Sequence, residues 1–60
     1  MNLPPPPLTV PEVAGYLGVG DDVVRDLLRR KALRGEKVGG QWRVLPKDLA
    51  EYMLETFEKP

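Results

Sequence analysis

Basic residues and glycines gather in the middle of the sequence at spacings suited to binding phosphate groups. Arg25 and Arg29 lie four residues apart, so in a helix both guanidinium groups project from one face. Further along, Lys37 and Arg43 flank the pair Gly39–Gly40. Arginine contacts phosphates or guanine edges, lysine contacts phosphates, and glycine lets a backbone amide approach a phosphate closely. The pattern predicts a surface that binds a polyanion.

The charges are segregated along the chain, although the formal net charge is zero. Eight of the nine Lys and Arg residues lie between residues 25 and 47 with two acids among them, so this segment carries +6. The segments before and after it each carry −3. A basic middle between acidic flanks indicates a directional surface for a polyanionic partner. An unevenly charged, solvated surface is the alternative.

The sequence lacks the residues on which most enzymes and metal sites depend. It has no His, no Cys and no Ser, which removes the usual zinc ligands, the common nucleophiles and the commonest general base. The lack of Cys fits a reducing compartment. No apolar run is long enough to span a membrane, and the N-terminus carries no export signal. We therefore expect a cytoplasmic protein that is not an enzyme, has no metal or other cofactor and has no membrane partner.

Two short helices are expected to position the two arginines. Residues 10–17 begin with the capping-box spacing of Thr9 and Glu12, carry apolar residues at helical spacing and end at Gly18. A second helix is predicted over residues 21–32. Its buried positions are expected to be Val23, Val24, Leu27 and Leu28. The link between the helices has three residues, and its Val19 is expected to fill the core. So short a link predicts a helix-turn-helix.

A tight hairpin is predicted around the two central glycines. If they form a two-residue turn, Lys37 faces Trp42 and Glu36 faces Arg43. Alternation then places Trp42 on the inner face, with the stem of Lys37 over its ring. A lone hairpin is not stable in water, so Trp42 is expected to anchor it on the helices. We expect Arg43 to project toward the same polyanion as the arginines of the second helix.

A third helix is predicted over residues 46–57, with an apolar face that covers roughly half of its circumference. This surplus of apolar surface leaves self-association or another protein contact open. The apolar face comprises Leu49, Tyr52, Met53, Leu54 and Phe57. Residues 1–8 are expected to be a proline-rich tail, residues 9–57 the folded domain and residues 58–60 a C-terminal tail.

The order helix, turn, helix, hairpin, helix is a mainly α fold with a small β-hairpin, a winged helix-turn-helix. From Leu8 to Met53 the chain resembles the excisionase-type, MerR-related family in its opening "LTVPEVAGYLGV", its second helix "VVRDLLRR" and its "KVGGQWR". The resemblance implies double-stranded DNA as the partner. It places the second helix in the major groove and the hairpin, or wing, on the backbone or in the minor groove.

The family resemblance also implies the protein's role and its candidate contacts. Members act as directionality or architectural factors beside an integrase or another DNA-bound protein, or as regulators of transcription, which would place this chain at the nucleoid. The recognition-helix candidates are Asp22, Arg25, Arg29 and Arg30. The wing and junction candidates are Lys31, Arg34, Lys37, Gly39, Gly40, Gln41 and Arg43, with Trp42 as the structural anchor.

Two acids at the start of the second helix depart from the pattern of relatives, which commonly have Ser and Arg there. Asp21 and Asp22 are expected to stabilise the helix through its dipole, by about 0.3–1 kcal/mol each. They would repel phosphate, although Asp22 can accept a hydrogen bond from a cytosine amino group. The spacing also predicts ion pairs from Asp21 to Arg25 and from Asp26 to Arg30. We therefore expect either that base-specific reading by the second helix is lost, or that the docking is rotated so that the wing and the end of the second helix dominate DNA binding.

The acidic residues and the broad apolar face of the third helix keep a second function open. The same fold can serve as a protein-interaction module with little DNA affinity, for example as a phage packaging or regulatory adaptor. Small domains similar to this one also occur in phage packaging proteins.

Overall fold

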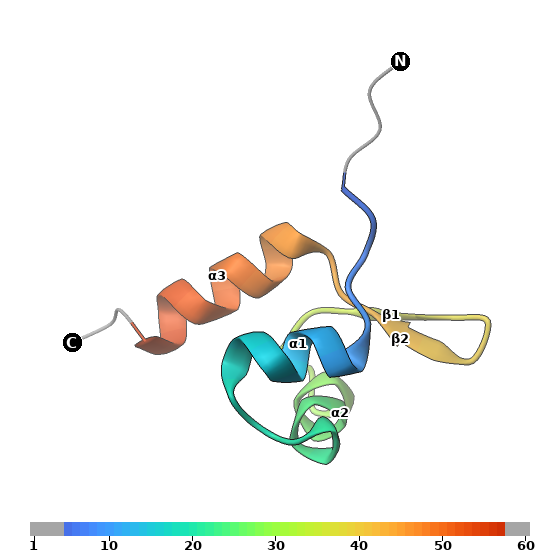
Figure 1. The fold of residues 1–60 in the computed structure, drawn as a ribbon, viewed down its shortest axis with the longest axis horizontal. Coiled ribbons are helices and arrows are strands. Elements are labelled where there is room, and N and C mark those ends of the chain that lie inside the picture. Colours follow the sequence, from blue (N-terminus) through green and yellow to red (C-terminus); the bar gives the residue numbers. More distant parts are fainter. Residues whose placement is uncertain (1–4, 58–60) are drawn as a thin grey trace.

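The computed structural model describes residues 5–57 and has the predicted order of elements (Figure 1). The helices are α1 (Val10–Leu17), α2 (Asp21–Arg29) and α3 (Pro46–Phe57), and the antiparallel strands are β1 (Glu36–Val38) and β2 (Gln41–Arg43). In Figure 1 the hairpin projects on one side of the α1–α2 pair and the end of α3 on the other. The winged helix-turn-helix fold expected from the sequence is confirmed.

Helix α1 begins and ends where the sequence predicts. The amide of Thr9 donates to Glu12 Oε1 at 2.8 Å, and the amide of Glu12 donates to Thr9 Oγ1 at 3.3 Å, which forms the capping box. At the other end, Gly18 adopts a φ of +71°, and its amide donates to the carbonyl of Ala14 at 2.8 Å. Both ends of this short helix are therefore fixed by local hydrogen bonds.

Helix α2 ends three residues earlier than predicted, because the chain turns back to bury Leu33, which is 1 % exposed. Lys31 adopts a left-handed φ of +63°, a position that glycine usually fills. Its amide donates to the carbonyl of Leu28 at 3.1 Å. The amide of Ala32 donates to the carbonyl of Leu27 at 2.9 Å. Together these bonds form a Schellman motif with a lysine at its left-handed residue.

The core is formed by nine buried apolar residues from the helices and the connecting segments. They are Val10, Val13, Ala14, Val24, Leu27, Leu28, Leu33, Val44 and Leu49. The expectation that Val19 and Val23 are buried is wrong, since they are 39 % and 41 % exposed. A helix on the surface of so small a core buries only a narrow stripe, and Val23 lies about 100° around α2 from Val24.

The hairpin has the predicted register and turn. Lys37 pairs with Trp42, and Glu36 pairs with Arg43. The two turn glycines have φ values of +61° and +83°, which fit a type I′ turn and strain any residue other than glycine.

An additional β-bridge joins the hairpin to the segment before α1. The amide of Leu8 donates to the carbonyl of Val44 at 2.7 Å, and the amide of Val44 donates back at 3.0 Å. The bridge joins Leu8, the last residue of the predicted N-terminal tail, to the residue that follows β2. The C-terminal tail predicted at residues 58–60 lies outside the described residues.

Helix α3 packs on the core mainly through its first two turns. Leu49 is buried, and Tyr52 and Met53 are half-buried against the core. Leu54 and Phe57 are 57 % and 61 % exposed. The broad apolar face predicted for this helix is thus only partly covered by the rest of the domain.

Candidate nucleic-acid interface

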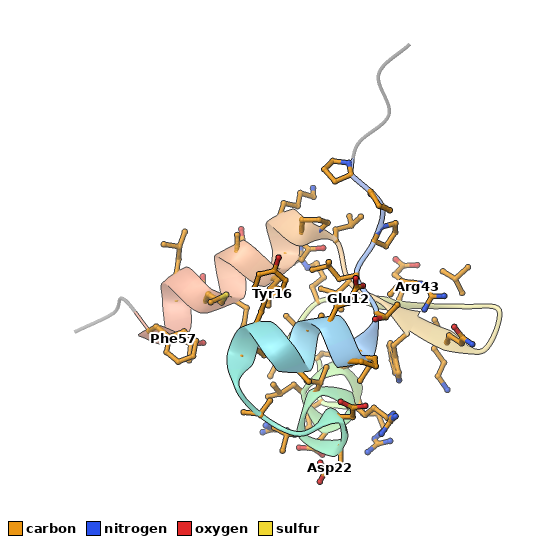
Figure 2. All side chains as sticks on the ribbon, viewed as in Figure 1. Glu12, Tyr16, Asp22, Arg43 and Phe57 are labelled. Atoms are coloured by element: carbon orange, nitrogen blue, oxygen red, sulfur yellow. The ribbon has the colours of Figure 1, made fainter. Side chains whose placement is uncertain are left out.

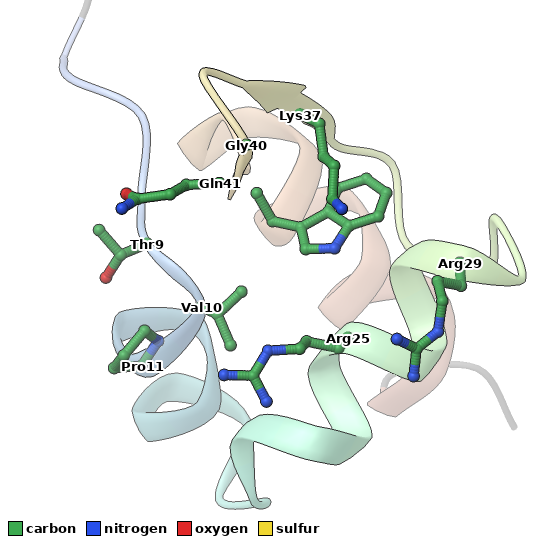
Figure 3. Close-up of a pocket in the computed structure, with 9 residues that line it drawn as sticks. Thr9, Val10, Pro11, Arg25, Arg29, Lys37, Gly40 and Gln41 are labelled. Carbon is green, nitrogen blue, oxygen red and sulfur yellow. The ribbon is translucent and has the colours of Figure 1, made fainter.

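An open concavity of about 550 Å³ lies between α2, the hairpin and the start of α1 (Figure 3). Arg25 and Arg29 reach it from successive turns of α2, and Lys37 reaches it from β1. Gln41 and Gly40 contribute the wall near the tip of the hairpin. We call this the first concavity. The helix and the hairpin therefore bring three cations together at one place.

All the charged side chains that line the first concavity are positive. Arg25, Arg29 and Lys37 are all exposed, and none of the described residues that line the site is an acid. Three like charges around one space repel one another, and a bound anion relieves that repulsion. The geometry suits an anion that carries several acceptor oxygens, such as a phosphate group.

A second concavity of about 610 Å³ adjoins the first at the base of the hairpin. It shares Arg29 and Lys37 with the first and adds Lys31 and Arg34 from the segment that follows α2. Glu36 is the acid on its wall. The predicted junction residues therefore extend the basic surface along the hairpin.

Arg43 does not join this surface, and the expectation that it faces the same side as the α2 arginines is wrong. It lies across from Glu36, on the face of the hairpin opposite Lys37, and lines a third concavity with Lys47. Its guanidinium donates to its neighbours, through Nη1 to the carbonyl of Trp42 at 3.0 Å and through Nη2 to Gln41 Oε1 at 2.9 Å. Alternation along β2 explains the outcome, because consecutive side chains leave opposite faces. Lys37 supplies the cation that had been expected from Arg43.

Two predicted members of the recognition helix also lie away from the first concavity. Arg30 Nε pairs with Asp26 Oδ2 at 2.9 Å, and this is the one salt bridge among residues 5–57. The predicted pair of Asp21 with Arg25 is therefore not formed. The carboxylate of Asp22 folds back over the residue that caps α2, and Figure 2 shows it on the side of the molecule away from Arg43. DNA contacts by Asp22 and Arg30 stay predictions.

Trp42 forms the wall between the first and second concavities, and it is half-buried. Its ring packs against the core, as expected of an anchor. Lys37 Nζ lies 5.6 Å from the centre of the ring, so the predicted cation–π contact is confirmed. The same contact holds the lysine beside the arginines of α2.

Gly35 is a positioning residue that the sequence analysis missed. A Cβ at this residue would lie 2.6 Å from Leu28 Cδ2 of α2 and 3.0 Å from the carbonyl oxygen of Arg43 in β2. Only a residue without a side chain lets the hairpin approach α2 this closely. Thr9 and Pro11 also line the first concavity and were not foreseen. They reach it through the pairing of Leu8, for which the sequence has no local signal.

Between residues 5 and 57, no group of three or more potential metal ligands comes together. Over the same residues, no helix has both the length and the apolar character needed to cross a membrane.

A family model described as a helix-turn-helix domain matches residues 7–56, a span that includes α1, α2, the hairpin and all but the last residue of α3. No curated protein and no solved structure gives a significant match to the chain.

Proposed function

The chain belongs to this helix-turn-helix family, which is of the excisionase type, and we propose that it binds double-stranded DNA through the face that α2 shares with the hairpin. The observation that carries the proposal is the convergence of Arg25, Arg29 and Lys37 on one concavity with no acid on its wall. Cations that project from a helix and a hairpin toward the same space can contact one duplex at two places.

In the proposed complex, α2 lies in the major groove and the hairpin follows the backbone or the minor groove beside it. Arg25 and Arg29 suit guanine edges or phosphates. Lys37 suits a phosphate oxygen, and the amides of Gly39 and Gly40 lie at an open turn where a backbone can come close. This assignment uses every cation of the first concavity.

The acidic start of α2 favours docking through its second half. Asp21 and Asp22 lie in the first turn, where phosphates otherwise bind well to helix N-termini. Their charges stabilise the helix dipole and repel the DNA backbone. The duplex is therefore expected to approach the end of α2, where the first and second concavities adjoin.

The salt dependence of DNA binding tests this proposal. In a titration of a short labelled duplex followed by fluorescence anisotropy, about four or five phosphate contacts give a slope of log K against log salt near −4. Arg25→Gln and Lys37→Gln should each weaken binding, and each should make the slope shallower by about 0.9 if the lost contact is to a phosphate. Lys47→Gln is the matched control, because it removes one charge from the start of α3, which lines the third concavity and neither of the first two.

Two results would contradict the proposal. One is the absence of binding at tens of micromolar protein, since even non-specific binding has dissociation constants of about 10⁻⁴ to 10⁻⁶ M. The other is an equal effect of Lys47→Gln and the two test substitutions, which would mean that net charge alone sets the affinity. Circular dichroism of each variant shows whether it is folded.

The finer role proposed is that of an architectural factor that acts at the nucleoid beside another DNA-bound protein such as an integrase. The small number of cations supports this choice over independent regulation of transcription, because few phosphate contacts give weak binding by a single copy. A DNA-bending assay with and without the neighbouring protein distinguishes the roles. Full affinity and full site selection by the chain alone would favour a transcriptional regulator.

Contact with a protein through α3 is a second candidate function, favoured by the exposure of Leu54 and Phe57. Apolar side chains of this size on one helix face can serve a partner or a second copy. Sedimentation of the natural chain and of a Leu54→Gln variant at several concentrations tests self-association. If both sediment as monomers with and without DNA, self-association through α3 is excluded.

A further inference from the structure

Within residues 5–57, the fold leaves the indole N–H of Trp42 unused. It donates to no acceptor among residues 5–57, where the side-chain hydrogen bonds are made by other groups. Every buried side-chain nitrogen or oxygen in this part of the chain has a partner, so the indole nitrogen must reach solvent. A tryptophan that only anchors a hairpin can bury this group against an acceptor. Here the N–H is left available for a ligand.

The surroundings of the ring specify what kind of ligand that is. Trp42 lines both the first and the second concavity, and Arg29 and Lys37 line both with it. The indole, the guanidinium and the ammonium group can only donate hydrogen bonds. A ligand that satisfies all three must offer several acceptor oxygens and negative charge, which is the chemistry of a phosphate.

We propose that the indole N–H of Trp42 donates a hydrogen bond to a backbone phosphate of bound duplex DNA, beside the cations of Arg29 and Lys37. This inference rests on the DNA-binding function proposed above and adds a contact to it. Trp42 then has two roles. Its ring anchors the hairpin on the core, and its indole N–H contacts the DNA backbone. A phosphate contact of this kind fixes the position of the duplex and carries no sequence preference.

Replacing the N–H by sulfur isolates this contact from the anchoring role of the ring. The chain has 60 residues and can be made by chemical synthesis with benzothienylalanine at position 42, which keeps the shape of the ring. The thermal unfolding curve should be unchanged, because the N–H makes no hydrogen bond within residues 5–57. The affinity for a duplex should fall about tenfold, which corresponds to about 1.4 kcal/mol. The salt slope should stay the same, because no cation is removed.

Tyr16→Phe is the matched control for the loss of one aromatic donor. Tyr16 is 65 % exposed on α1 and lies outside both concavities, so the loss of its hydroxyl should not change DNA affinity. The chain has one tryptophan, so a ¹⁵N-labelled sample gives one indole signal. Addition of the duplex should move that signal downfield and slow the exchange of its proton with water.

The outcomes separate the indole contact from DNA binding itself. If the natural chain and the sulfur variant bind the duplex equally well, the contact is refuted and the DNA-binding function stands. If the natural chain does not bind the duplex, both proposals fail. Inorganic phosphate that moves the indole signal as far as DNA does at the same phosphate concentration would indicate a site for free anions, which also overturns the contact proposed here.

Discussion

Replacing Gly35 by alanine tests whether the close contact between the hairpin and α2 sets the geometry of the interface. The new Cβ would lie 2.6 Å from Leu28 Cδ2, 3.0 Å from the carbonyl oxygen of Arg43 and 3.2 Å from Val44 Cγ2. Leu28 is 3 % exposed and Val44 is 0 % exposed, so neither side chain can swing into solvent. The hairpin must move away from α2 instead, and overpacking of this kind costs about 1–3 kcal/mol.

Gly15→Ala is the matched control, because it adds the same methyl group on the open face of α1. No atom lies within 4 Å of a Cβ at this position, and alanine is more favourable than glycine in a helix by about 0.8–1.0 kcal/mol. The midpoints of urea unfolding should therefore move in opposite directions. The free energies of unfolding of the two variants should differ by about 2–4 kcal/mol.

The two variants should also differ in DNA binding. Gly35→Ala displaces Lys37 relative to Arg29 and should lower the affinity of the folded protein, whereas Gly15→Ala should bind as the natural chain does. If the two variants are equally stable, Gly35 is not the contact point that we infer. If Gly35→Ala binds DNA normally while folded, the spacing of the hairpin and α2 does not matter to the interface.

Three further predictions test separate parts of the structure. Lys31→Gly should raise the free energy of unfolding by about 1 kcal/mol, since it relieves the strain of a left-handed backbone conformation at this residue. It should also weaken DNA binding by removing a cation, and stronger or unchanged binding by anisotropy would argue against a contact there. Lys37→Glu should weaken DNA binding more than Arg43→Glu does, because only Lys37 shares a face with the α2 arginines; equal losses would contradict that placement. Thr9→Ala should lower the free energy of unfolding by about 1 kcal/mol through loss of the capping box, and an unchanged thermal midpoint would show that the box does not matter.

The helices and the hairpin could be predicted from the sequence because local rules determine them. The capping box at Thr9 fixes the start of α1, and Gly18 fixes its end. Both signals involve residues only a few positions apart. The two adjacent glycines of the hairpin allow the only common turn that needs two positive φ values, so the strand register follows. Each of these features depends on side chains that are close together in the sequence.

The remaining features depend on contacts between distant parts of the chain. The bridge of Leu8 to Val44 forms only after the hairpin is placed against α1. The left-handed turn at Lys31 serves the burial of Leu33, which overrides the preference for glycine at such a position. From the sequence, alternation placed Arg43 on the outer face of the hairpin, and that face was expected to meet the same polyanion as the α2 arginines. The face of the hairpin decides its position, and Trp42 fixes that face when it packs on the core.

The segregation of charge, and not its sum, determines the kind of DNA binding that this chain can have. With a formal net charge of zero, the protein as a whole is not attracted to DNA. Screening by salt also limits the range over which surface charges interact to about 8 Å at physiological ionic strength. Only the basic face can then hold a duplex, and a single copy stays near the non-specific range of about 10⁻⁴ to 10⁻⁶ M. We therefore propose that binding at one chosen place needs a second attachment, through a neighbouring DNA-bound protein or a linked module, because effective concentration multiplies weak affinities. In the proposed complex, the first attachment is made by the cations that line the first and second concavities, which are Arg25, Arg29, Lys31, Arg34 and Lys37.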